Sequence, residues 1–179
     1  GAEIMLCPKS EDINQYAEKI TNDRKNNGAK NPYFIPAGGA NLIGTLGYVE
    51  CMSEIMEHDK DKTFTHIVHG TGSGGTQSGV LAGKKYFNSN INIIGISIKN
   101  NKETQENNVF KLANETCNRL KCKAVNRNEV VVFDEYIGRG YGIPTEGMKQ
   151  AVKLMAQKEA ILLDPVYSGK AFAGLIDLI

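Results

Sequence analysis

The sequence predicts an open α/β fold in three layers, with a mostly parallel sheet between helices. Apolar runs that indicate strands alternate along the chain with segments whose apolar residues recur at helical spacing. The strand runs are too continuously apolar for a sheet that has one face in water. A dense glycine cluster, residues 70–75, separates one predicted strand from the next predicted helix. Open α/β folds bind their ligands at such turns, beyond the carboxyl ends of the strands.

The N-terminal third is predicted to hold one strand and two helices. Residues 4–7 form a short apolar run that indicates a strand, and apolar residues at helical spacing indicate a helix over 10–26. A polar loop at 26–32 and a glycine-containing turn at 37–41 precede a second helix, expected over 45–58.

From residue 65 onward, the predicted strands and helices alternate. The strands are apolar runs, and the helices are recognised by apolar residues on one face. Their expected bounds are residues 65–69, 91–98, 129–133 and a short run ending at Asp164 for the strands, and 76–87, 104–121, 145–158 and a last helix from Ser168 for the helices.

Length and charge exclude several function classes. The chain has 179 residues, enough to bury a sizeable core, and 21 basic against 20 acidic side chains give a formal net charge of +1. Because no large positive field or basic stripe results, nucleic-acid binding is not expected. No apolar run reaches the length of a membrane span, and no signal peptide is visible, so we expect no membrane association.

The four cysteines suggest neither a metal centre nor a disulfide framework. No pair has the CxxC spacing of a zinc site, and all four lie in apolar or helical stretches. Extracellular chains more often use cysteines in bridges, so the sequence favours a reducing, cytoplasmic location.

The glycine cluster is predicted to bind a phosphate group. Glycines let successive backbone N–H groups converge on an anion, and the positive end of the following helix favours negative charge there. The expected ligands lie in the loop Gly72, Ser73, Gly74, Gly75 and Thr76, whose hydroxyls add donors. The alternative is a glycine-rich turn that only lets a strand and a helix pack closely.

The same loop also matches the GxGxxG dinucleotide pattern at Gly70, Gly72 and Gly75. An NAD site needs Asp or Glu at the end of the next strand, but Lys99 follows that strand here. NAD is therefore disfavoured, whereas an NADP-binding α/β domain remains an alternative. A P-loop is excluded because the Gly-Lys-Ser/Thr sequence is missing.

Two tyrosines lie in short segments ahead of predicted helices. Tyr141 stands among the glycines of residues 138–147, and Tyr167 follows Asp164 and a proline. Turns of this kind carry sites in α/β folds, although a tyrosine at either place could equally be a packed side chain. His66 and His69 alternate along a predicted strand and are interpreted as strand residues rather than ligands.

Three segments together resemble the family of D-cysteine desulfhydrases and 1-aminocyclopropane-1-carboxylate (ACC) deaminases. They are residues 35–50, the glycine loop at 72–79, and Asp-Pro-Val-Tyr-Ser-Gly-Lys-Ala at 164–171. Members of this family are pyridoxal-phosphate enzymes of fold type II, the group similar to tryptophan synthase β. The resemblance covers nearly the whole chain and implies a lyase that uses pyridoxal phosphate on a small amino acid.

The resemblance also implies roles for individual residues. Backbone amides of residues 73–76 would hold the phosphate of the cofactor. Tyr167 would be the nucleophile or proton carrier beside the substrate, and Tyr141 a second tyrosine that tunes it. Ser168 would set substrate specificity, because the deaminases carry Glu at this position and the desulfhydrases carry a small hydroxyl residue. A side chain without charge favours β-elimination of thiolate, so D-cysteine desulfhydrase is preferred over ACC deaminase.

The resemblance implies that this chain is part of a longer protein. In the family, the lysine that forms the Schiff base lies in an Asn-Lys motif far upstream, and another cofactor-pocket segment follows the position of Ile179. Neither is present here. We therefore expect an internal piece, inactive alone, in which residues 1–35 end the smaller domain and 36–179 form most of the larger one. The full-length form is expected to be a homodimer, as is usual in the family.

Overall fold

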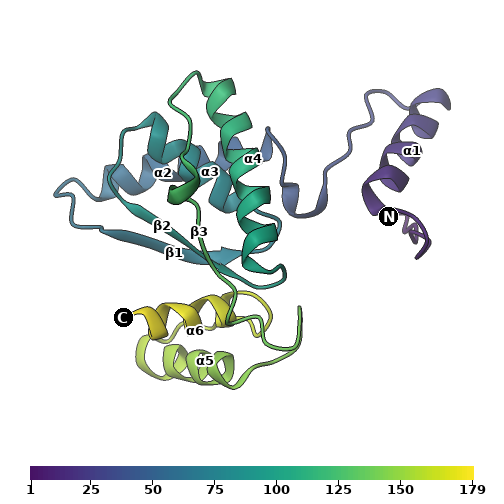
Figure 1. The fold of residues 1–179 in the computed structure, drawn as a ribbon. Coiled ribbons are helices and arrows are strands. Elements are labelled where there is room, and N and C mark those ends of the chain that lie inside the picture. Colours follow the sequence, from purple (N-terminus) through teal and green to yellow (C-terminus); the bar gives the residue numbers. More distant parts are fainter. The chain divides into compact units, whose positions relative to one another are not determined.

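The computed structural model describes residues 1–179, shown as a ribbon in Figure 1. The chain divides into two compact units, Gly1–Gly39 and Ala40–Ile179. The larger unit contains the whole sheet and all but one of the α-helices.

The smaller unit contains helix α1 (Ile13–Asn26) and a short 3-10 turn at Ala37–Gly39. Asp12 begins α1, because its carboxylate accepts hydrogen bonds from the first-turn amides of Asn14 and Gln15. The strand predicted over residues 4–7 is wrong, since those residues have no regular structure and Ile4 is 86% exposed. A strand needs a partner for its backbone groups, and this segment pairs with none.

The sheet of the larger unit has three parallel strands in the order β1-β2-β3. They are β1 (His66–Thr71), β2 (Asn92–Ser97) and β3 (Val131–Phe133). Because all three run the same way, their carboxyl ends lie at one edge of the sheet. The register places Thr71 opposite Ser97 there.

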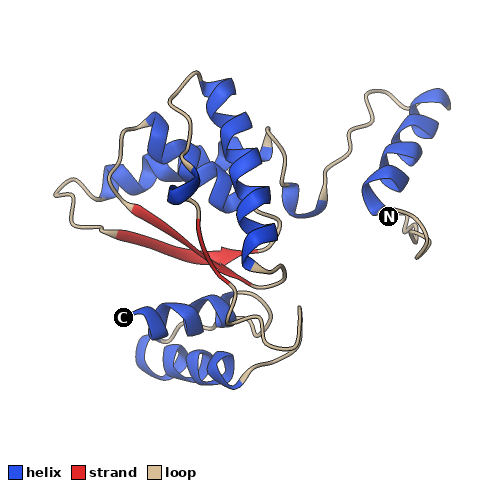
Figure 2. Cartoon of the chain, in the orientation of Figure 1, coloured by secondary structure: helices blue, strands red, loops and turns tan.

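Helices cover both faces of this sheet, which confirms the predicted three-layer α/β fold (Figures 1 and 2). Three helices lie on one face and two on the other. The first group is α2 (Gly44–His58), α3 (Gly75–Tyr86) and α4 (Lys102–Leu120), with a 3-10 turn at Arg127–Glu129, and the second is α5 (Glu146–Glu159) and α6 (Ser168–Leu178).

The main core lies between the sheet and α2, α3 and α4. Its buried residues include Leu81 of α3, Ile93 of β2 and Val109 of α4. Small residues let α2 and α3 approach closely, because a Cβ atom on Gly79 would lie 2.5 Å from the Thr45 carbonyl oxygen. This close approach places the N-terminal half of α3, and the loop before it, beside α2.

Two further expectations about strands change with the structure. The short strand predicted before Asp164 is wrong, because residues 160–164 form no strand and Leu162 is 88% exposed. The strand predicted over 65–69 continues to Thr71, so that Gly70 belongs to β1 and not to the loop. None of the helices has the length and apolar character that a membrane crossing requires.

Candidate active site

The glycine loop connects the carboxyl end of β1 to the first turn of α3. Residues 72–74 lie between the two elements, and Gly75 and Thr76 of the loop form the first turn of α3. Gly74 has a φ of +86°, in the left-handed region that side chains strongly disfavour. A Cβ atom on Gly75 would lie 3.2 Å from the Ala40 Cα atom. The backbone conformation therefore favours glycine at position 74, and a side chain at position 75 would be tightly packed against Ala40.

The amides at the start of α3 are free to meet an anion. Gly74 caps the helix without any side-chain hydrogen bond, whereas Asn101 caps α4 and Thr145 caps α5 through their side chains. Uncapped first-turn N–H groups and the positive end of the helix together suit a phosphate group. Ser73 is exposed and Thr76 half-buried, so their hydroxyls lie at the surface of this cradle.

A buried network of polar side chains holds the glycine loop against α4. Gln105 of α4 is fully buried, and its Nε2 donates to the Thr71 hydroxyl at 2.8 Å. Asn100 Nδ2 donates to Gln105 Oε1 at 2.8 Å and to the Gly72 carbonyl at 3.4 Å. These bonds connect the end of β1 and the loop to α4, and so hold the cradle in one conformation.

Tyr167 lies across the strand that leads into the loop. A Cβ atom on Gly70 would lie 2.6 Å from its ring carbon Cε1, so the ring packs against a position without a side chain. The Tyr167 hydroxyl donates to the Gly70 carbonyl at 3.4 Å. This places a phenol at the margin of the predicted phosphate cradle.

The environment of Tyr167 keeps its phenol protonated. Burial raises the pKa of Tyr167, the phenols of Tyr48 and Tyr141 raise it further, and a hydrogen bond from the Gly72 backbone opposes the shift. Tyr141, the second predicted tyrosine, therefore acts electrostatically on the Tyr167 phenol. Tyr48 of α2 also acts on Tyr167, although it was not among the predicted site residues. Its position in a regular helix gave no sign of a site, and its place near Tyr167 depends on the close approach of α2 to α3.

Asp164 organises the first turn of α6. Its carboxylate accepts hydrogen bonds from the amides of Val166, Tyr167 and Ser168 at 2.8, 2.6 and 2.8 Å, and from the Ser168 hydroxyl at 2.5 Å. These bonds lower the pKa of Asp164 to about 2, against an opposing effect of desolvation that is the largest single contribution. The Ser168 hydroxyl also accepts from the Asp164 amide at 2.8 Å. Asp164 thus fixes the backbone that carries Tyr167.

His69 and Gln77 each carry a buried polar atom without a partner. His69 Nδ1 contacts the Gly70 carbonyl at 2.8 Å, but its Nε2 contacts no polar group, and neither does Gln77 Oε1. Burial lowers the pKa of His69, which therefore stays neutral near pH 7. The prediction that His66 and His69 are strand residues is confirmed, since both lie in β1.

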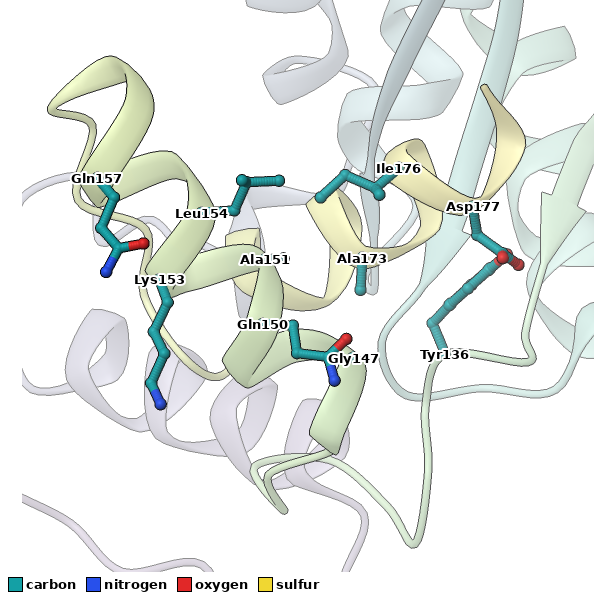
Figure 3. A pocket seen from close by; sticks show the side chains of 10 residues that line it. All are labelled: Tyr136, Gly147, Gln150, Ala151, Lys153, Leu154, Gln157, Ala173, Ile176 and Asp177. Atoms are coloured by element: carbon teal, nitrogen blue, oxygen red, sulfur yellow. The ribbon is translucent and has the colours of Figure 1, made fainter.

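An apolar cavity lies elsewhere in the larger unit. It has a volume of about 620 Å³ and lies between α5 and α6 (Figure 3). The Tyr136 hydroxyl at its margin donates to the Asp177 carboxylate at 2.7 Å. None of the predicted site residues lines this cavity, so it is separate from the glycine loop, Tyr141 and Tyr167.

Comparisons with known proteins agree with these features. The profile of a family described as "Pyridoxal-phosphate dependent enzyme" matches residues 1–179. A D-cysteine desulfhydrase of Klebsiella pneumoniae subsp. pneumoniae is 42% identical over 147 residues, which are 82% of this chain and 44% of that protein. A crystal structure described as an ACC deaminase homologue is 38% identical with a TM-score of 0.86, and the match covers 96% of this chain and 52% of that one. The chain spans about half the length of these relatives.

Proposed function

Because the chain belongs to the pyridoxal-phosphate dependent enzyme family, we propose that it forms the phosphate-binding and tyrosine-bearing part of a D-cysteine desulfhydrase. The reaction converts D-cysteine and one water molecule into pyruvate, hydrogen sulfide and ammonia. The observation that carries the proposal is the position of the Tyr167 ring, packed on Gly70 directly before the glycine loop. The NADP alternative finds no support in the comparisons.

The residues of the glycine loop fit the phosphate of the cofactor. The amides of residues 73–76 would donate to its oxygens, and the hydroxyls of Ser73 and Thr76 would add two further donors. Gly72 and Gly74 would let the backbone approach closely. The buried contact between Gln105 and Thr71 would keep these donors aimed without any rearrangement on binding.

Tyr167 would carry the proton in the reaction. When bound, pyridoxal phosphate supplies an electron-accepting ring that stabilises negative charge at the α-carbon of an amino acid. The raised pKa of Tyr167 keeps a proton on its Oη atom near neutral pH. Removing that proton requires positive charge nearby, and Tyr141 would orient and tune the phenol. Tyr167 could then exchange a proton with the substrate or with its leaving group.

Ser168 supports elimination rather than ring opening. Its own side chain carries no charge, and its hydroxyl donates to the Asp164 carboxylate and accepts from the Asp164 amide. A neutral side chain occupied in this way would not add a carboxylate next to the cofactor ring. ACC deaminase is the second candidate, and the 38% identical solved structure described as an ACC deaminase homologue favours it.

Two further properties belong to the same proposal. The four free thiols fit a reducing, cytoplasmic location. The full-length protein would act as a homodimer on a small amino-acid substrate.

The test uses the full-length protein loaded with pyridoxal phosphate. D-cysteine should yield sulfide and pyruvate in equal amounts, and replacing Tyr167 by Phe should lower turnover by at least about 100-fold, the lower end of the range for one proton-transferring group. The exposed Tyr33→Phe variant is the matched control and should retain full turnover. Opening of the cyclopropane acid without sulfide from D-cysteine would establish the deaminase instead. Near-normal turnover by the Tyr167→Phe variant would leave Tyr167 as a packing residue.

A further inference from the structure

Lys170 is the only buried lysine of the chain. It has no exposed surface, and its Nζ donates to the backbone carbonyls of Ile137 at 2.7 Å and Gly140 at 2.9 Å. No carboxylate forms an ion pair with it, and burial lowers its pKa. Burying an ammonium group without a counter-charge lowers folding stability, so we expect its two hydrogen bonds to have a structural role.

Helix formation does not explain this lysine. Lys170 lies in the first turn of α6, where the positive end of the helix disfavours a cation. A lysine that served the helix would lie in its last turn and face water. The geometry instead directs the side chain away from its own helix toward the segment that precedes α5.

That segment is a glycine-rich loop that needs outside support. Gly138, Gly140 and Gly142 all have positive φ angles, of +67°, +148° and +77°. Glycines lose more conformational freedom on ordering than other residues do, so this loop is costly to fix. Its own turn hydrogen bonds, Ile137 to Asp134 and Ile143 to Gly140, are both 3.3 Å long. The bonds from Lys170 are shorter and come from a rigid helix.

The two hydrogen bonds from Lys170, here called the tether, join the segments that carry Tyr141 and Tyr167. Tyr141 directly follows Gly140, which Lys170 holds, and Tyr167 lies three residues before Lys170 at the start of α6. The phenol of Tyr141 raises the pKa of Tyr167, which agrees with this arrangement. We propose that Lys170 is a positioning residue that ties the loop at 137–140 to α6 and so places Tyr141 beside Tyr167. Its effect on turnover rests on the proposed function, whereas the tether itself does not.

The tether is tested first by proteolysis of the full-length protein without cofactor. Arg139 is exposed in the middle of the loop and offers a cleavage site for trypsin. The Lys170→Met variant keeps the length of the side chain but loses its donors, and cleavage after Arg139 should accelerate at least about tenfold. Lys153→Met, at an exposed position on α5, is the matched control and should not change the rate. An unchanged rate in Lys170→Met would overturn the tether.

A second variant guards against global unfolding. Lys170→Gln keeps an N–H donor without the charge, and its cleavage rate should lie between those of wild type and Lys170→Met. Both variants are digested at a temperature where thermal unfolding curves show them folded. Equal cleavage of Lys170→Gln and wild type, together with fast cleavage at many other sites in Lys170→Met, would show general destabilisation and would overturn the proposal.

The catalytic consequence is tested by a double-mutant cycle in the loaded enzyme. Lys170→Met should lower kcat about tenfold or more while KM changes less than about threefold, because a displaced group costs rate more than binding. Added to Tyr141→Phe, it should lower kcat by less than a further factor of about three, since both changes remove the same contribution. Fully multiplicative losses would show that Lys170 does not act through Tyr141. If wild type releases no keto acid from D-cysteine or the cyclopropane acid, the proposed function fails, and the cleavage rates alone then decide on the tether.

Discussion

Replacing Gly70 by Ala tests whether the position of the Tyr167 ring matters for turnover. Gly70 lies in β1 with an ordinary negative φ, so the new methyl group causes no backbone strain. It would meet the Tyr167 ring at 2.6 Å from Cε1 and 2.8 Å from Cδ1, whereas the Ala171 Cβ atom at 3.5 Å is an ordinary neighbour. The substitution therefore acts on one side chain.

The size of the effect follows from this distance. Carbon atoms in contact are separated by about 3.5–4.0 Å, so the ring must retreat by about 1 Å. A displacement of this size in a reacting group costs about 100-fold in rate, equivalent to about 2.7 kcal/mol of transition-state stabilisation. The half-buried ring can move toward solvent, so the loss of folding stability should stay near the lower end of the usual 1–3 kcal/mol for overpacking.

The assay compares turnover of D-cysteine with urea unfolding for the full-length Gly70→Ala variant. Gly147→Ala is the matched control, because its Cβ atom would lie 3.6 Å from the Ala173 Cβ atom and meets no clash. Turnover should fall about 100-fold in the first variant and stay normal in the second. Normal turnover in a folded Gly70→Ala protein would refute the assigned position of Tyr167. A Tyr167→Ala background should abolish the stability cost of Gly70→Ala, since the clash partner is gone.

Three further predictions concern stability and cofactor binding. The pKa of Asp164 lies below its ordinary value, so the contribution of this carboxylate to folding stability is present at neutral pH and is lost as pH falls from about 4 toward 2. Because the carboxylate is exposed, Asp164→Asn should lower the free energy of unfolding by about 1 kcal/mol or less. Urea unfolding at pH 7 and pH 2.5 measures the difference. Gln105→Leu leaves the buried Thr71 hydroxyl without its donor and should cost about 1–3 kcal/mol in the same experiment. It should also weaken binding of pyridoxal phosphate about tenfold without affecting pyridoxal, followed by absorbance titration; equal weakening of both would contradict a role at the phosphate. Met52→Ala empties a fully buried site of α2 and should cost about 2–5 kcal/mol, and a smaller loss would mean that the core closes around the cavity.

The parts of the fold that the sequence predicted are those with a local cause. The glycine loop follows from one contiguous run in which Gly74 must adopt a positive φ, and a helix must then begin at the next residue. The long helices follow from apolar spacing, and α4 is found within two residues of its expected start. Both incorrect strands are short apolar runs, at 4–7 and before Asp164. Their apolar character was real, but pairing depends on a neighbouring strand that a local pattern does not reveal.

The parts of the candidate site that the sequence missed depend on contacts between distant segments. Tyr48 reaches the other tyrosines only because Gly79 allows α2 and α3 to touch. Gln105 lies 34 residues from its partner Thr71, and its position on α4 resembles any other polar residue of that helix. Lys170 could be read as one more charged residue, since only its two carbonyl partners show that it is buried.

The position of the Tyr167 ring depends on two residues that lie far apart in the sequence, Asp164 and Gly70. The carboxylate of Asp164 accepts the amides of Tyr167 and Ser168, which fixes the backbone at the start of α6 and with it the direction of the Tyr167 ring. That direction is acceptable only because Gly70 has no side chain in its path. The Tyr167 phenol would thus be aligned by the Asp164 carboxylate, which fixes its backbone, and by the missing side chain at Gly70, which leaves room for its ring. A change at either place should therefore affect the same step, so Asp164→Asn should slow turnover by a larger factor than its small effect on stability would suggest.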